Sequence, residues 1–163
     1  AKNIVIDPVM VATSGSALMV EGAGKALVEE LFPLGTVLTP NIPEAEALSQ
    51  TKIRNRQDME EAARIISSFT GGAVLVKGGH LSESADDLLY EQGKSIWLPG
   101  ERVDNSNTHG TGCTLSSAIA CGLAGGKSLE DSVKGAKAYI TGALKAGLDL
   151  GKGSGPLNHM YAL

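Results

Sequence analysis

The chain has 163 residues, of which 42% are hydrophobic and 20% are charged, a composition typical of a globular protein with a sizeable core. Its formal net charge is -4 and aromatic residues make up only 4%, which argues against nucleic-acid binding because such surfaces need basic patches and stacking rings. No apolar run reaches the length of a membrane span and the first residues lack a signal pattern, so we expect a cytoplasmic protein without membrane partners.

Apolar strands alternate with helical stretches along the chain. We expect strands over 4–6, 36–39 and 73–77, a hairpin formed by 87–90 and 95–98, and helices over 22–32, 43–48, 58–69, 115–124 and 128–145. The alternation predicts an α/β fold, with a mostly parallel sheet and helices on both of its faces.

Polar residues lie at the ends of three of the expected strands. Asp7 follows the first strand, Asn41 and Glu44 follow the second, and Lys77 ends the third. Ligands of such folds bind outside the carboxyl ends of the strands, so we expect these residues at one edge of the sheet. Together they suit a complex of Mg²⁺ with a nucleotide. Singly, each has a structural explanation: Asp7 forms a turn before Pro8, Glu44 faces a helix dipole and Lys77 is a solvated strand end.

The stretch 107–114 is expected to be a turn that opens a helix and binds an anion. Gly110 and Gly112 flank Thr111 and let successive amides point one way, and the start of a helix adds positive potential. Cys113 lies in the same turn, where a thiol is a plausible base or nucleophile. The alternative is a glycine-rich helix start with a buried, inert cysteine.

The two cysteines, Cys113 and Cys121, are predicted to be free thiols. They lie on one expected helix, eight residues and therefore about 12 Å apart, which is beyond the reach of a disulfide. Free thiols are consistent with a reducing compartment. His109 and Cys113 have the spacing of a metal pair, but no second Cys/His pair lies nearby, which argues against a structural zinc site.

Four motifs in order resemble the hydroxymethylpyrimidine/phosphomethylpyrimidine kinases of thiamine biosynthesis, members of the ribokinase-like superfamily. They are Asp7-Pro8-Val9-Met10-Val11-Ala12, Thr39-Pro40-Asn41-Ile42-Pro43-Glu44-Ala45-Glu46, Lys77-Gly78-Gly79-His80 and Thr108-His109-Gly110-Thr111-Gly112-Cys113. The resemblance extends to 153–159, and it implies a single ribokinase-like domain over 1–163 of the three-layer α/β/α type.

The resemblance implies phosphorylation of 4-amino-5-hydroxymethyl-2-methylpyrimidine, and then of its monophosphate, by ATP with Mg²⁺. Asn41 and Glu44 would organise the metal ion through water, with Asp7 nearby. Lys77 and Thr108 would contact the nucleotide.

The resemblance also assigns the glycine-rich turn. Gly110, Thr111, Gly112 and Cys113 would form an anion hole, in which Gly110 and Gly112 also contact the nucleotide phosphates. Cys113 would be the general base on the acceptor hydroxyl, where most of the superfamily has aspartate.

The sequence departs from the family at its front. Family members begin with further strands that supply much of the pyrimidine pocket, and this sequence resembles only the C-terminal part. Val9 and Met10, with Cys113, would line the remaining part of the substrate site. We therefore expect the chain alone to be inactive or nearly so.

Two other functions fit the same residues. Some vitamin B6 kinases share the Gly-Thr-Gly-Cys turn and phosphorylate pyridoxal or pyridoxine. The chain could instead be a non-catalytic nucleotide-binding or oligomerisation module, and the sequence leaves open a homodimer.

Overall fold

The computed structural model describes residues 2–10, 22–79, 85–101, 103, 105, 109–148, 150 and 155–162. The chain divides into two compact units, Ala1–Gly100 and Glu101–Leu163. Within the described ranges, no helix is both long enough and apolar enough to cross a membrane.

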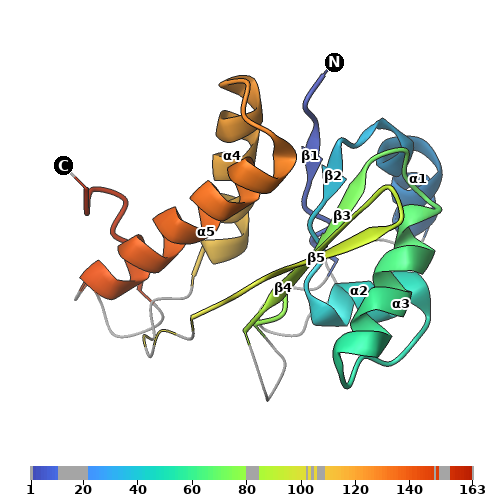
Figure 1. The fold of residues 1–163 in the computed structure, drawn as a ribbon, viewed down its shortest axis with the longest axis horizontal. Coiled ribbons are helices and arrows are strands. Elements are labelled where there is room, and N and C mark those ends of the chain that lie inside the picture. Colours follow the sequence, from blue (N-terminus) through green and yellow to red (C-terminus); the bar gives the residue numbers. More distant parts are fainter. Residues whose placement is uncertain are drawn as a thin grey trace. The chain divides into compact units, whose positions relative to one another are not determined.

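The first unit is built on a five-stranded sheet with the strand order β1-β2-β3-β4-β5 (Figure 1). The strands are β1 (Val5–Ile6), β2 (Val37–Leu38), β3 (Ala73–Val76), β4 (Asp87–Glu91) and β5 (Lys94–Leu98). The first three are parallel, whereas β4 and β5 form the expected hairpin and pair antiparallel. The α/β class is confirmed, and the sheet is mixed because the hairpin extends the parallel strands.

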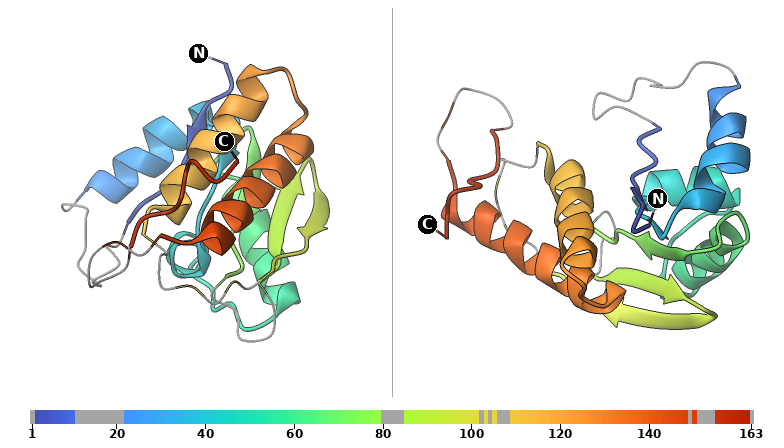
Figure 2. Two further views of the ribbon diagram at one scale, coloured as in Figure 1. Left: turned by 90° about the vertical axis from the view of Figure 1, so that its left-hand side faces the viewer. Right: turned by 90° about the horizontal axis from the view of Figure 1, so that it is seen from above.

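A two-residue turn connects the two strands of the hairpin. Gln92 and Gly93 both have positive φ, 50° and 78°. This backbone twist matches the right-handed twist of the flanking strands, so short hairpins favour it. β4 and β5 consequently stay paired over their whole length, from Asp87 opposite Leu98 to Glu91 opposite Lys94 (Figure 2).

Two helices pack one face of the sheet. They are α2 (Ile42–Ser49) and α3 (Arg56–Ser67), and α3 contacts both β3 and β4. The buried side of α3 carries Met59, Ala62, Ala63 and Ile66, all fully buried. These side chains join the strand residues Leu38, Val74, Val76 and Leu88 in one hydrophobic core. The helical spacing of these four residues in the sequence predicts one apolar face, and their burial confirms it.

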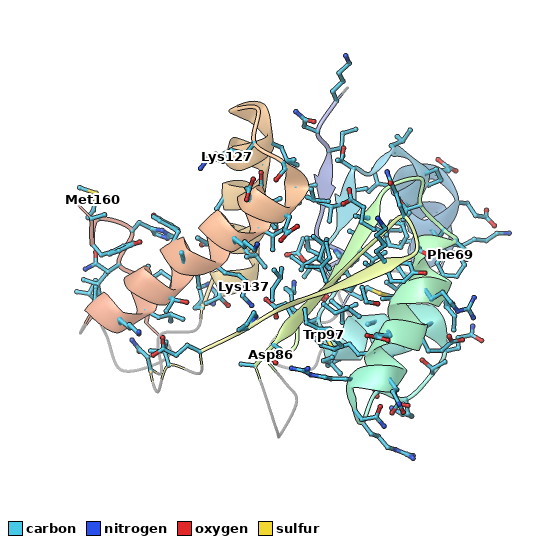
Figure 3. The ribbon with its side chains drawn as sticks, viewed as in Figure 1. Phe69, Asp86, Trp97, Lys127, Lys137 and Met160 are labelled. Atoms are coloured by element: carbon cyan, nitrogen blue, oxygen red, sulfur yellow. The ribbon has the colours of Figure 1, made fainter. Side chains whose placement is uncertain are left out.

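The hairpin is also tied to the first turn of α3 by polar contacts. The guanidinium of Arg56 lies over the ring of Trp97, 4.6 Å from its centroid, and pairs with the carboxylate of Asp86 (Figure 3). The indole N–H of Trp97 donates to Glu60 Oε1 at 2.9 Å. These contacts hold the N-terminal part of α3 against β5.

The segment expected as one helix over 22–32 has a more complex structure. It consists of a short α1 (Ala23–Ala26), a π-helical turn η1 (Leu27–Leu31) and a 3₁₀ turn η2 (Phe32–Leu34). Pro33 lies in the first turn of η2, where its missing N–H is tolerated, but it cannot continue a regular α-helix. Phe32 is fully buried and anchors the segment to the core.

The second unit is a helix pair, α4 (Thr111–Ala124) and α5 (Leu129–Ala146), which lie against each other (Figure 2). A Cβ atom at Gly122 would lie 2.7 Å from Ser132 Oγ, so glycine allows the close approach. Ser128 caps α5, because its Oγ accepts from the N–H of Asp131 at 3.1 Å. The sequence spacing of Val133, Ala136, Ile140 and Leu144 predicts a buried face of α5. Val133 and Ala136 are buried, whereas Ile140 and Leu144 are half-buried.

Candidate functional site

The carboxyl ends of β1, β2 and β3 bring the predicted site residues of the first unit together. Ile6 of β1 pairs with Leu38 of β2. The residues that follow them, Asp7 and Thr39, therefore lie side by side. Asn41 forms a parallel bridge with Lys77, whose N–H donates to the carbonyl of Pro40 at 2.9 Å. The expectation that polar residues meet at one sheet edge is therefore met for these groups.

Asp7 and Lys77 form an ion pair at this edge. Lys77 Nζ lies 2.9 Å from Asp7 Oδ1, and the two side chains are only 17% and 14% exposed. Because water screens this pair less than a surface pair, its electrostatic interaction is stronger. Lys77 is thus held inside the site and is not a solvated strand end.

Asn41 and Glu44 form a reciprocal cap at the start of α2. The N–H of Glu44 donates to Asn41 Oδ1 at 2.9 Å, and the N–H of Asn41 donates to Glu44 Oε2 at 2.8 Å. Pro43 stands in the first turn, where its missing N–H is tolerated. The Asn-x-x-Glu pair therefore has a structural role in addition to any role in ligand binding.

The Glu44 carboxyl group is buried, with 4% of the residue exposed. Burial raises its pKa above the ordinary value of 4.5, although hydrogen bonds from the backbone of Asn41 and Met10 and the charge of Lys77 oppose the shift. The charge of Asp7 raises the pKa further. Both members of the neighbouring ion pair therefore influence the pKa of Glu44, in opposite directions.

The donor set fits a magnesium ion that keeps most of its water. In the described part of the chain, no cluster of three or more His, Cys, Asp or Glu side chains could hold a metal ion. Mg²⁺ usually takes one or two carboxylates and completes its shell with water and phosphate oxygens. Asp7, Glu44 and the amide of Asn41 supply oxygens of this kind, so the residues present fit the ion.

The glycine-rich turn opens α4 in the second unit. Gly110 is the N-cap residue with a φ of 79°, a left-handed conformation that glycine adopts without strain. The first helical hydrogen bond runs from the N–H of Thr114 to the carbonyl of Gly110 at 2.9 Å. The N–H groups of Gly112 and Cys113 come before this bond in the first turn of the helix, so no helix carbonyl is available to accept from them. Thr108 lies outside the described residues.

The two cysteines on α4 are both exposed free thiols. The expectation of no disulfide is confirmed, and the alternative of a buried, inert Cys113 is wrong. His109 forms a bridge with Pro156.

The residues after Asp7 have different environments. Val9 is 45% exposed, and its N–H donates to the carbonyl of Asp7 at 2.9 Å. Met10 is half-buried and packs on the core, and its backbone hydrogen-bonds the Glu44 carboxylate. Their role in substrate binding stays a prediction.

Two supporting residues were not expected from the sequence. Thr39 is fully buried and donates to Asp7 Oδ1 at 3.1 Å. Asp87, on β4, accepts from the N–H of Gly78 at 2.8 Å and so fixes the turn that follows Lys77. The sequence signals for Thr39 were its place at the end of an expected strand and its place at the start of the second motif, neither of which assigned it a role. Asp87 gave no signal.

Comparison with known proteins identifies the family of the chain. A family model described as phosphomethylpyrimidine kinase matches residues 1–158. The chain belongs to this family. It is 45% identical over 159 residues to the hydroxymethylpyrimidine/phosphomethylpyrimidine kinase of Streptomyces coelicolor, and 46% identical over 164 residues to that of Rhizobium meliloti. These matches cover 98% of this chain but 59% and 62% of the relatives, so the chain spans about three fifths of their length.

Solved structures support the same fold. A pyridoxal kinase from Staphylococcus aureus in complex with AMP-PCP matches with a TM-score of 0.89 at 36% identity, over 99% of this chain and 59% of that one. A Clostridium difficile phosphomethylpyrimidine kinase matches with a TM-score of 0.72 at 39% identity, over 84% of this chain and 55% of that one. This chain, as a member of the phosphomethylpyrimidine kinase family, thus has the ribokinase-like α/β fold that its motifs implied.

Proposed function

We propose that the complete gene product phosphorylates 4-amino-5-hydroxymethyl-2-methylpyrimidine and its monophosphate with ATP, in thiamine biosynthesis. Family membership and the names of the relatives support this reaction. The structural observation that carries it is the Asp7–Lys77 ion pair, which lies at the carboxyl ends of parallel strands beside the Asn41–Glu44 cap. A cytoplasmic location is part of the same proposal.

The first unit supplies the groups that bind the phosphates. Lys77 donates to the nucleotide phosphates, while Asp7, Asn41 and Glu44 hold the hydration shell of Mg²⁺. The ion, when bound, neutralises charge on the transferred phosphoryl group. The ion pair keeps the Lys77 ammonium at the sheet edge before the nucleotide arrives, which reduces the reorganisation needed on binding.

The second unit supplies the groups that act on the acceptor. The amides from Gly110 to Cys113 donate to the transferred phosphoryl group, and Thr108 contributes to nucleotide binding. Cys113 accepts the proton of the substrate hydroxyl. The hydroxyl oxygen then forms a bond to the γ-phosphorus as the bond to the β-phosphate oxygen breaks, and ADP leaves. The exposure of the Cys113 thiol supports its access to substrate.

A turnover assay tests the proposal. The complete gene product is incubated with ATP, Mg²⁺ and either the pyrimidine alcohol or its monophosphate, and ADP release is followed. We expect ADP release to depend on each acceptor. ATP consumption that is the same with and without either acceptor would contradict the proposal.

Pyridoxal is the second candidate substrate. The observation in its favour is the match to solved pyridoxal kinases, with TM-scores of 0.84 and 0.89 for the Bacillus subtilis and Staphylococcus aureus proteins. Phosphorylation of pyridoxal is measured beside that of the pyrimidine alcohol. A higher kcat/KM for pyridoxal would assign the chain to vitamin B6 metabolism.

A further inference from the structure

Thr39 has a buried hydroxyl that is aimed at the candidate site. The residue is 0% exposed and stands one position after β2. Its Oγ1 lies 3.1 Å from Asp7 Oδ1 and 3.4 Å from the carbonyl of Ile6. That carbonyl already accepts the N–H of Thr39 at 2.9 Å. The single hydroxyl proton therefore goes to the carboxylate, since hydrogen bonds to ionised acceptors are the stronger ones.

Thr39 and Lys77 donate to the same oxygen of Asp7. The Lys77 ammonium lies 2.9 Å from Oδ1 and the Thr39 hydroxyl lies 3.1 Å from it. Among the described residues, the hydrogen bonds seen to the Asp7 carboxylate both end on Oδ1. Rotation of a carboxylate about its last torsion is soft, so each donor on Oδ1 restricts the orientations that the carboxylate can adopt. Neither of these two donors contacts Oδ2.

The two donors differ in what happens when a nucleotide binds. In the proposed function, Lys77 donates to the phosphates, so its hold on Asp7 weakens at that moment. Thr39 is buried and cannot follow a ligand. Of these two donors, the Thr39 hydroxyl is then the one that still holds Asp7 Oδ1 in place.

We propose that Thr39 is a positioning residue, which orients Asp7 so that Oδ2 faces the hydrated Mg²⁺ of the nucleotide complex. This inference rests on the proposed function, because it takes Asp7 as a metal-site residue. It adds a residue that neither touches the substrate nor binds the ion. Its effect should pass entirely through Asp7.

The test is a double-mutant cycle in the complete protein. Thr39→Val removes the hydroxyl at nearly constant shape, Thr39→Ser retains it, and Asp7→Asn removes the carboxylate charge. Binding of Mg-ADP is measured by calorimetry at several Mg²⁺ concentrations, together with kcat and KM. Loss of a hydrogen bond to a charged group predicts that Thr39→Val weakens Mg²⁺-dependent ADP binding by about tenfold. Thr39→Ser should stay within about threefold of the wild type.

The cycle separates positioning from a general structural effect. In the Asp7→Asn background, Thr39→Val should weaken binding by less than about twofold, because the residue through which it acts is already altered. Thr70→Val is the matched control. Thr70 is a half-buried threonine of the same unit, whose hydroxyl contacts the carbonyl of Gly35 at 3.4 Å away from the site, and this variant should bind normally.

Each outcome decides the inference. Normal Mg-ADP binding by Thr39→Val, or an equal loss in both backgrounds, would overturn it. If the valine variant does not fold, Thr39→Ala takes its place with the same expected loss. Absence of turnover on both pyrimidines, with the coupling in Mg-ADP binding intact, would refute the proposed substrate while it leaves the role of Thr39 supported.

Discussion

The N–H of Glu44 donates to Asn41 Oδ1 while the Glu44 carboxylate accepts from the N–H of Asn41, at 2.9 and 2.8 Å. The two residues proposed to organise Mg²⁺ are thus also the cap of α2. The arrangement presents a preformed pair of oxygens, because the cap fixes both side chains before any ligand binds. An alanine variant of either residue would therefore change both the stability of α2 and the proposed metal site, and the two effects could not be separated.

Asn41→Ser separates these two roles. Serine is as good an N-cap as asparagine, so we expect the free energy of unfolding to change by less than about 0.5 kcal/mol. The amide is lost, however, and the Mg²⁺ concentration needed for half-maximal activity should rise about tenfold. Urea unfolding and a Mg²⁺ titration of turnover measure the two effects.

The matched control is Asn55→Ser at the start of α3. Asn55 accepts from the N–H of Asp58 at 2.9 Å and so makes the same type of cap in another helix. This variant should match Asn41→Ser in stability but retain the wild-type Mg²⁺ dependence. An equal shift of the Mg²⁺ midpoint in both variants would remove Asn41 from the metal site.

The titration of Glu44 should contribute to the pH dependence of the free energy of unfolding. Burial raises its pKa above the ordinary value of 4.5, so the folded protein binds more protons than the unfolded chain between the two values. The free energy of unfolding therefore contains a contribution that falls as pH rises from about 4.5 through the raised pKa. Glu44→Gln keeps an acceptor oxygen but does not titrate, so its stability relative to the wild type should increase over this window.

Denaturant unfolding of both proteins at several pH values between 4 and 8 tests this sign. Glu61→Gln is the control, because the Arg64 hydrogen bond lowers the pKa of that exposed carboxyl group. A difference curve for Glu44→Gln that falls as pH rises would show that the carboxylate is stabilised in the folded protein.

The Asp7–Lys77 pair should matter for stability as well as for function. Lys77→Met leaves the Asp7 carboxylate without its cation in a site where both side chains are largely buried. We expect a loss of roughly 2 kcal/mol, which is less than for a fully buried pair because some exposure remains. In the Asp7→Asn background the same change should cost less than half as much.

The exposed pair of Lys52 and Glu46 provides the comparison. Its N–O distance is also 2.9 Å, but the Lys52 side chain is 74% exposed. Lys52→Met should therefore change the free energy of unfolding by less than about 1 kcal/mol. Equal losses for Lys52→Met and Lys77→Met in urea unfolding would show that burial adds nothing to the pair in the site.

Sequence patterns located the strands and their ends because buried strands are short apolar runs and polar residues interrupt them. The positions of Asp7, Asn41 and Lys77 at one sheet edge followed from that rule alone. The contact between Thr39 and Asp7 could not be predicted, because it depends on the register of β1 and β2, which neither segment specifies by itself. The π-helical turn over Leu27–Leu31 was also missed, since its residues fit a regular helix equally well.

Cys113→Ala tests the proposed general base, and α4 offers its own control. Removal of a general base lowers kcat by about 100-fold or more, whereas KM for ATP should change by less than about threefold because the turn amides remain. Cys121 is a second exposed thiol on the same helix, eight residues further on. Cys121→Ala should keep the wild-type kcat, which excludes a general effect of removing a thiol from α4. If Cys113→Ala also turns over normally while ATP still binds, the proton is accepted by another group and the turn serves only to bind phosphate.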